Sequence, residues 1–157
     1  MAKVNRLPLL FALFQTAELH MTPGVFVELA HSFNLGRQYA LEVFALLASG
    51  QMQIAYPTPE EVALRESLPT TLGAGERESI AVVRARGGAV LSNESRVAHY
   101  CHQYGIPCLR IPDILRALWG EGIVSKDEVQ DIVRDLQTND RMQFKPSVLE
   151  VIFAEER

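Results

Sequence analysis

The chain has 157 residues, of which 48% are hydrophobic and 22% charged, and its net charge is −4. This composition is that of a folded globular protein with a buried core, which excludes an intrinsically disordered chain, and we expect a single domain over residues 1–157. The acidic balance argues against a surface that holds nucleic acid by bulk positive charge. The negative net charge is still compatible with a nuclease that has a carboxylate cluster, because a bound metal ion reverses the sign of the local charge.

Cysteine content and hydropathy bear on the location of the protein. Cys101 and Cys108 are too few for a disulfide framework. The apolar run over 7–14 continues as an amphipathic helix and is far shorter than the ~20 residues of a membrane span. We therefore expect a cytoplasmic protein without a membrane segment.

Apolar spacing and turn residues predict helices that alternate with short strands. In chain order we expect a helix over 3–14, an extended piece at 19–21, a helix that begins at Thr22-Pro23, a helix over 38–48, a strand over 52–56, and a loop with one or two helical turns over 57–71. Next come a helix from about Glu76 to Gly87, a strand over 89–91, a helix over 95–104, a strand over 107–111, a helix from Pro112 to about Gly120, a helix opened by a capping box at 125–128, and a last helix from about Pro146. This order predicts an α/β fold with a small, mainly parallel sheet.

Apolar stripes on three of these helices predict the core. The residues expected to face inward are Phe26, Leu29, Ala30 and Phe33 of the second helix, Val129, Ile132, Val133 and Leu136 of the capping-box helix, and Val148, Val151 and Ile152 of the last helix.

Three acidic residues lie beside apolar stripes or at a strand end: Glu28, Glu76 and Glu94. Glu94 follows the strand at 89–91, and ligands of open parallel sheets bind at this carboxyl edge. Carboxylates gathered there can hold Mg²⁺ or Mn²⁺, which can activate water against a phosphodiester. Each also has an ordinary explanation, because Glu76 favours a helix dipole and the other two suit a solvated surface.

Other polar residues give weaker signals. The spacing of His99, Cys101, His102 and Cys108 matches no structural zinc site, so we interpret them as ordinary residues of a helix and the following strand. Ser92 has no His-Asp partners that would make it a nucleophile.

Four segments together resemble the PIN domain, the fold of VapC-type toxins and related ribonucleases. They are LGAGERESIA at 72–81, VLSNESR at 90–96, MTPGVFVEL at 21–29, and the stretch from Gly105-Ile106-Pro107 through Val124. The resemblance covers nearly all of the chain and implies a three-layer α/β fold. It also implies a metal-dependent ribonuclease that acts on single-stranded RNA, with a toxin-type endoribonuclease as one form of this activity. The partners that it implies are an antitoxin protein and further copies of the chain in a homo-oligomer.

The resemblance assigns site residues position by position. Glu28 and Glu76 match the second and third acidic positions of the family, which bind Mg or Mn, and Glu94 stands where the family usually has aspartate. Asn93 replaces a neighbouring aspartate. Arg96, with Ser92 and Asn93, is expected to contact the nucleic acid. The alternative is a catalytically inactive PIN-fold module that binds nucleic acid or protein.

The family opens with an apolar strand that ends in the first metal-binding aspartate, and this chain starts just after the equivalent point. The resemblance therefore implies that the first, central strand is missing from the chain, either because the start codon is assigned too late or because the chain is truncated. We expect either a four-stranded sheet with its centre re-closed or a dimer across the exposed edge.

Overall fold

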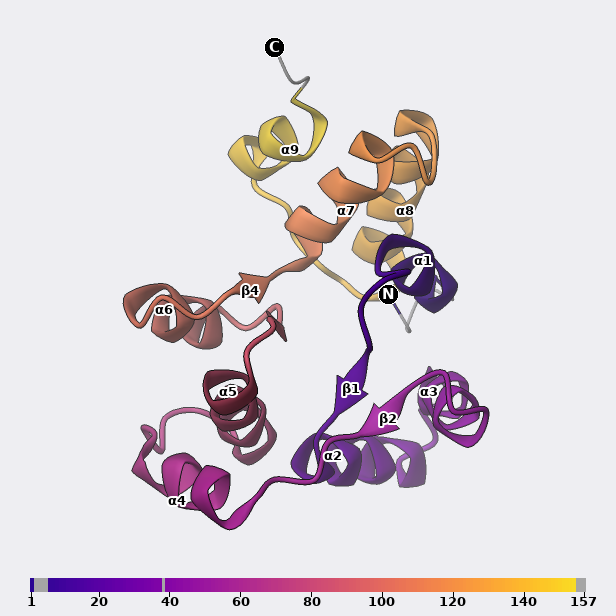
Figure 1. Cartoon of the computed structure of the whole chain (residues 1–157). Coiled ribbons are helices and arrows are strands. Elements are labelled where there is room, and N and C mark those ends of the chain that lie inside the picture. The colour runs from indigo at the N-terminus through magenta and orange to yellow at the C-terminus, as the bar shows by residue number, and fades with distance from the viewer. Residues whose placement is uncertain (2–5, 38, 155–157) are drawn as a thin grey trace. The chain divides into compact units, whose positions relative to one another are not determined.

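The computed structural model of the chain describes residues 1, 6–37 and 39–154. Its helices and strands, in chain order, are α1 (Leu7–Leu13), β1 (His20–Met21), α2 (Pro23–Asn34), α3 (Tyr39–Ala48), β2 (Gln53–Ile54), α4 (Pro59–Ser67), α5 (Ala74–Arg86), β3 (Val90–Leu91), α6 (Ser95–Gln103), β4 (Cys108–Leu109), α7 (Ile111–Gly120), α8 (Lys126–Asn139) and α9 (Pro146–Phe153). Figure 1 labels all of them except β3, which lies between α5 and α6 along the chain. Helices alternate with short parallel strands, which confirms the predicted α/β class.

The chain divides into two compact units, one formed by Met1–Ala17 with Arg110–Arg157 and the other by Glu18–Leu109. Each unit is described by itself, and the single domain expected over residues 1–157 stays a prediction. Residues 3–5 of the first predicted helix, and Gln38 of the fourth predicted element, lie outside the described residues. No helix of the described ranges has the length and apolar character needed to cross a membrane.

The four strands of the Glu18–Leu109 unit form two separate parallel pairs, β1 with β2 (Figure 1) and β3 with β4. In the first pair His20 lies opposite Gln53, and in the second Val90 lies opposite Cys108. Each pair is joined through helices, as parallel strands require. The expected four-stranded sheet with a re-closed centre is therefore wrong, because no described strand pairs β1 or β2 with β3 or β4. Pairing between copies of the chain stays a prediction.

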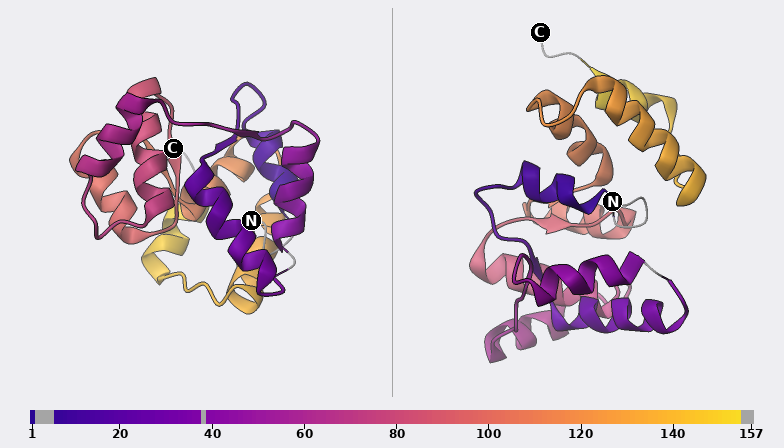
Figure 2. Two further views of the ribbon diagram at one scale, coloured as in Figure 1. Left: turned by 90° about the horizontal axis from the view of Figure 1, so that it is seen from below. Right: turned by 90° about the vertical axis from the view of Figure 1, so that its right-hand side faces the viewer.

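Helices α2 and α3 pack side by side (Figure 2). The ring of Phe44 lies 5.6 Å from that of Phe26 and 5.7 Å from that of Phe33, between ring centroids. The predicted stripe of α2 is only partly correct, because none of its residues is buried and Phe33 is 41% exposed. The Thr22 hydroxyl also does not cap α2; it lies 3.4 Å from the Ser79 hydroxyl of α5.

The segment over 57–71, predicted as a loop with one or two helical turns, contains the nine-residue helix α4. Its start is a capping box: the Glu61 amide donates to the Thr58 hydroxyl at 3.3 Å, and the Thr58 amide donates to the Glu61 carboxylate at 2.8 Å. Such a box satisfies backbone N–H groups that the first helical turn leaves free. The sequence Thr58-Pro59-Glu60-Glu61 carries this signal.

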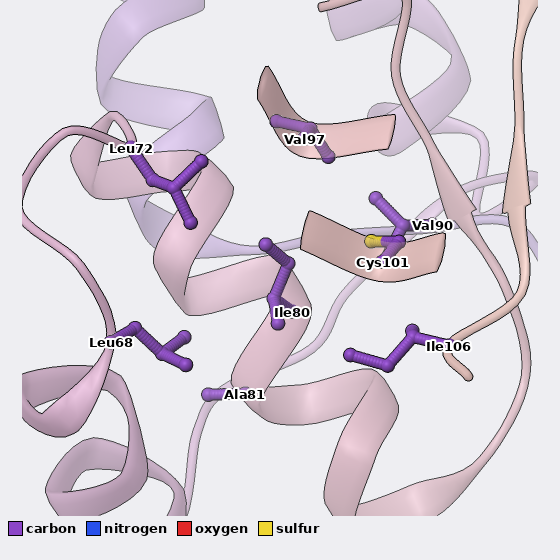
Figure 3. Close-up of a cluster of buried hydrophobic side chains, with 8 residues drawn as sticks. All are labelled: Leu68, Leu72, Ile80, Ala81, Val90, Val97, Cys101 and Ile106. Carbon is purple, nitrogen blue, oxygen red and sulfur yellow. The ribbon is translucent and has the colours of Figure 1, made fainter. Parts of the chain in front are cut away.

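The core of the Glu18–Leu109 unit forms around α5, β3 and α6. Its members are buried side chains from these elements and from the loops beside them: Leu68, Leu72, Ile80, Ala81, Val90, Val97, Cys101 and Ile106 (Figure 3). Because α5 supplies Ile80 and Ala81 and β3 supplies Val90, this core packs α5 against β3. The sequence puts Glu76 in the first turn of α5 and Glu94 after the end of β3.

The other unit is helical and built around α7, which contacts α1, α8 and α9. The Trp119 indole N–H of α7 donates to the Ile152 carbonyl of α9 at 2.7 Å. On α8 all four predicted inward residues are buried. On α9 Ile152 is buried as expected, whereas Val151 is 57% exposed, so that part of the predicted stripe is wrong.

Candidate functional site

Two glycines bring the amino-terminal turns of α2 and α5 into backbone contact. A Cβ atom on Gly75 would lie 3.0 Å from the Val25 amide nitrogen and 3.0 Å from a carboxylate oxygen of Glu28. A Cβ atom on Gly24 would lie 3.0 Å from the Gly75 Cα. Only glycine fits such a close approach without movement of the backbone. The contact brings the carboxylate of Glu28, on α2, to the start of α5.

Glu28 and Glu76 both bind to the amino-terminal end of α5. The Gly75 amide donates to Glu28 Oε1 at 3.2 Å, and the Gly73 amide donates to Glu76 Oε2 at 2.7 Å. Glu28 is exposed and Glu76 half-buried. The free N–H groups of a first helical turn attract carboxylates. The structure therefore brings two of the three predicted metal ligands, which are far apart in the sequence, to one helix end.

Glu94 lies at the amino-terminal cap of α6, directly after β3. Its side chain is exposed and makes no cap hydrogen bond. The Glu94 amide donates to the Ser92 hydroxyl at 3.2 Å, which orders the turn that contains the exposed Asn93. Glu94, Ser92 and Asn93 thus share the β3–α6 turn.

Arg96 lies in the first turn of α6, next to this β3–α6 turn. Its Nη1 donates to the Thr71 carbonyl at 2.9 Å, and the side chain is otherwise exposed. The bond fixes one end of the guanidinium against the loop between α4 and α5. The remaining N–H donors of Arg96 are available to an anion.

The two carboxylates at this site, those of Glu28 and Glu76, are of a ligand type that divalent cations bind. Carboxylate oxygens suit Mg²⁺ and Mn²⁺, and Mg²⁺ in particular is often bound by one or two carboxylates together with water and substrate phosphate. Within residues 6–37 and 39–154, no three side chains of the His, Cys, Asp or Glu type form a group that could hold a metal ion. The structure therefore brings the carboxylates of Glu28 and Glu76 to one helix end, and among the described residues neither Glu94 nor another His, Cys, Asp or Glu forms a three-membered group with them.

Glu78, buried between α2 and α4, was not predicted from the sequence. The Gly24 amide donates to its Oε2 at 2.5 Å, and Arg65 Nη1 donates to its Oε1 at 3.2 Å. These bonds tie the first turn of α2 to α5 and α4. No local sequence signal marks Glu78, because its partners lie 54 and 13 residues away.

Glu61, which is 3% exposed, is a second buried carboxylate that sequence reasoning did not single out. Arg86 Nε and Nη2 donate to its two oxygens at 2.7 and 2.6 Å. These hydrogen bonds hold the pKa of the Glu61 carboxyl below its usual value although burial raises it. The pair clamps α4 to the end of α5, so its role is structural.

Comparison with known proteins identifies the class of fold. The family model described as DUF3368, PIN domain, matches residues 1–156. The chain belongs to the PIN-domain family, which confirms the resemblance, and it has the nucleic-acid-binding, nuclease-type fold of that family. Comparison with curated proteins returned no match. Comparison with solved structures returned none either.

Proposed function

We propose that this chain is a metal-dependent ribonuclease of the PIN family. The observation that carries the proposal is the convergence of Glu28 and Glu76 on the first turn of α5. Two carboxylates at one helix end form an acidic site of the kind that phosphodiester hydrolysis with a hard cation needs. Membership of the PIN family supports nucleic acid as the substrate class.

In this proposal Glu28 and Glu76 hold Mg or Mn, and Glu94 completes the ligand set. Glu94 is suited to this role because it is exposed and its carboxylate has no hydrogen bond to a described residue, so that its side chain is able to reorient. The cation would supply activation of water and neutralisation of phosphate charge. Arg96 pairs with a phosphate of single-stranded RNA, and Ser92 and Asn93 contact the same strand from the β3–α6 turn.

The test is Mn²⁺-dependent cleavage of single-stranded RNA by the purified chain. We expect Glu76→Gln to lower the cleavage rate at least about 100-fold, because the variant removes the charge of a metal ligand. Asp127→Asn is the matched control, since Asp127 also lies in the first turn of a helix and is not one of the proposed ligands. Equal cleavage rates for Glu76→Gln and Asp127→Asn would contradict the proposed ligand set, provided that both variants keep the wild-type melting temperature.

The second candidate is a catalytically inactive PIN-fold module that binds nucleic acid or protein. It is supported by the finding that the described part of the chain contains no group of three metal-binding side chains. The same assay separates the two candidates. RNA that is bound but not cleaved with Mg²⁺ or Mn²⁺ would favour the module over the enzyme.

A toxin-type role, an antitoxin protein as partner, a cytoplasmic location and a homo-oligomer also belong to this proposal. Family membership supports the first two. The homo-oligomer is supported by the two short sheets, in which each strand pairs with a single neighbour among the described residues, since strand edges without a partner favour association.

A further inference from the structure

A groove runs along α6 on the side that faces the loop between α4 and α5. It has a volume of about 310 Å³. Its helical wall consists of Ser95, Arg96, His99, Tyr100 and Gln103, and its opposite wall includes Leu72. We call it the α6 groove. The volume is at the lower end of the range for small-ligand sites, which suits one nucleotide rather than a folded partner.

The chemistry of the α6 groove is that of a site for an anionic, partly aromatic ligand. None of its lining residues is acidic, although the chain has 19 acidic residues. Arg96 supplies a guanidinium, and the imidazole of His99 adds ring nitrogens that can bond polar groups. The local charge of the groove is therefore opposite in sign to that of the whole molecule.

The polar side chains of the groove have unused hydrogen-bonding capacity. Those of Ser95, His99 and Gln103 make no hydrogen bond to another described residue, and Arg96 uses one bond, to Thr71. Because Arg96, His99 and Gln103 are spaced three and four apart, they line one face of α6. This arrangement offers donors and an acceptor opposite a wall that contains the buried, apolar Leu72.

Aromatic rings extend this face beyond the groove. The Tyr100 and Tyr104 rings lie 4.5 Å apart, and the Arg84 guanidinium lies 5.9 Å from the centre of the Tyr104 ring. Single-strand-binding proteins combine such aromatic surfaces, which stack on bases, with cations that track the phosphates. The opposite end of the groove begins at Ser95, directly after Glu94, a proposed metal ligand.

We propose that the α6 groove binds an unpaired nucleotide of a single-stranded RNA, whose strand continues past Tyr104 toward Arg84. The inference rests on the proposed ribonuclease function, because it places this nucleotide next to the Glu94 end of the cleavage site. His99 and Tyr100 contact the base, Gln103 contacts a base edge, and Arg96 contacts a phosphate.

The test is the affinity of a fluorescein-labelled single-stranded RNA of about 12 nucleotides for the full chain, measured by anisotropy in EDTA so that no metal-dependent cleavage occurs. We expect His99→Ala and Arg96→Ala each to weaken binding about tenfold, and Arg96→Ala to lower the slope of log affinity against log salt by about one. His102→Ala is the matched control for His99, since His102 is exposed on the same helix and does not line the groove. Arg134→Ala, on α8, is the control for Arg96.

The outcomes separate this inference from the proposed function. If the groove variants bind RNA as tightly as the controls do, or if an RNA duplex of the same sequence binds as tightly as the single strand, the inference is overturned, even where Mn²⁺-dependent cleavage is present. If RNA binding depends on His99 and Arg96 but no cleavage occurs with Mn²⁺, the proposal that the α6 groove binds single-stranded RNA is supported and the ribonuclease proposal fails. Gln103→Ala keeps the test independent of the Arg96–Thr71 bond, and we expect about a threefold loss of affinity from the loss of one neutral hydrogen bond.

Discussion

The Glu61 carboxylate accepts two hydrogen bonds from Arg86 while its side chain lies almost entirely out of solvent. Charged hydrogen bonds of this kind are the strong ones, and their loss leaves charge without compensation. Arg86 holds the pKa of Glu61 below its usual value. A carboxyl with a depressed pKa in the folded state stabilises the protein above its unfolded-state pKa, and this contribution is lost as the pH falls through the folded-state pKa.

We expect Glu61→Gln to lower the free energy of unfolding at pH 7 by about 1.5 kcal/mol or more, the value of a charged hydrogen bond. The variant should also lose less stability than the wild type as the pH falls below the usual pKa of a glutamate carboxyl, because the titration of Glu61 is removed. Urea denaturation at several pH values measures both effects. Glu66→Gln is the control, since Glu66 is also paired with an arginine, Arg65, but its side chain is 62% exposed. An equal loss of unfolding free energy in the two variants would contradict the role of burial.

The thiol of Cys101 is fully buried in the core around α5 and α6. Burial raises its pKa to about 11, with a smaller contribution from the neighbouring Cys108. The thiolate is the reactive form, and at pH 8 about one thiol in a thousand would be ionised at that pKa.

We therefore expect the native chain to react with a disulfide reagent such as DTNB at Cys108, which is half-buried, and to leave Cys101 unreacted on the same time scale. In urea both thiols should react. Cys101→Ser and Cys108→Ser identify which thiol is responsible. Rapid labelling of Cys101 in the folded Cys108→Ser variant would show that this core opens.

At the scale of elements, the contact between α2 and α5 sets the geometry of the candidate site. It depends on Gly24 and Gly75, where a side chain would meet backbone atoms of the facing helix. Buried Glu78 adds bonds to α2 and α4 across the same contact. The positions of Glu28 and Glu76 follow from this packing and not from either helix alone.

We expect Gly75→Ala to lower the free energy of unfolding by about 1–3 kcal/mol, because the added methyl group overpacks the contact with Val25 and Glu28. Gly120→Ala is the matched control: Gly120 lies in helix α7 and an added Cβ would meet nothing within 4 Å. That variant should be unchanged or more stable by up to ~1 kcal/mol, since alanine favours the helix. Denaturant unfolding of both variants measures the difference, and a neutral Gly75→Ala would contradict the close approach of α2 and α5.

At the scale of the whole molecule, the family resemblance predicts exposed strand edges, and within the described part of the chain each strand pairs with a single neighbouring strand. Beside the β1–β2 pair the amides of Gln53 and Ala55 donate to the carbonyls of Leu19 and Met21, so the backbone groups of His20 point away from β2. The same pattern turns the backbone of Leu91 away from β4. Leu91 is also 42% exposed. Unpaired edges of this kind favour association between chains.

We expect the chain to form a dimer at micromolar concentration, and Leu91→Lys to shift it toward the monomer, because a charge on an open strand edge opposes pairing. Light scattering after size-exclusion chromatography measures the mass. Val151→Lys is the control, since Val151 is a comparably exposed aliphatic residue on helix α9. A wild-type mass of one chain at all concentrations would contradict the predicted association.

Local sequence signals were sufficient for much of the fold. Apolar spacing and capping residues located most helices, as the Ser125 capping box and the buried stripe of α8 show. Thr58 and Glu61 carry an equally clear capping box, so α4 was predictable from the sequence although we interpreted its segment as a loop. The predicted burial of the apolar stripe on α2 was too high. Helical spacing shows which residues share a face, but it does not show how much of that face another element covers.

The sequence by itself determined the α/β class, most element positions and the acidic residues of the candidate site, because these depend on residues that are close along the chain or on family motifs. Only the tertiary structure decided that the strands form two separate pairs, that Glu28 joins Glu76 at the start of α5, and that Arg96 and His99 line one groove. Glu78 and Arg86 find their partners in the same way. Each of these features depends on contacts between distant segments, whose geometry is set by packing rather than by local propensity.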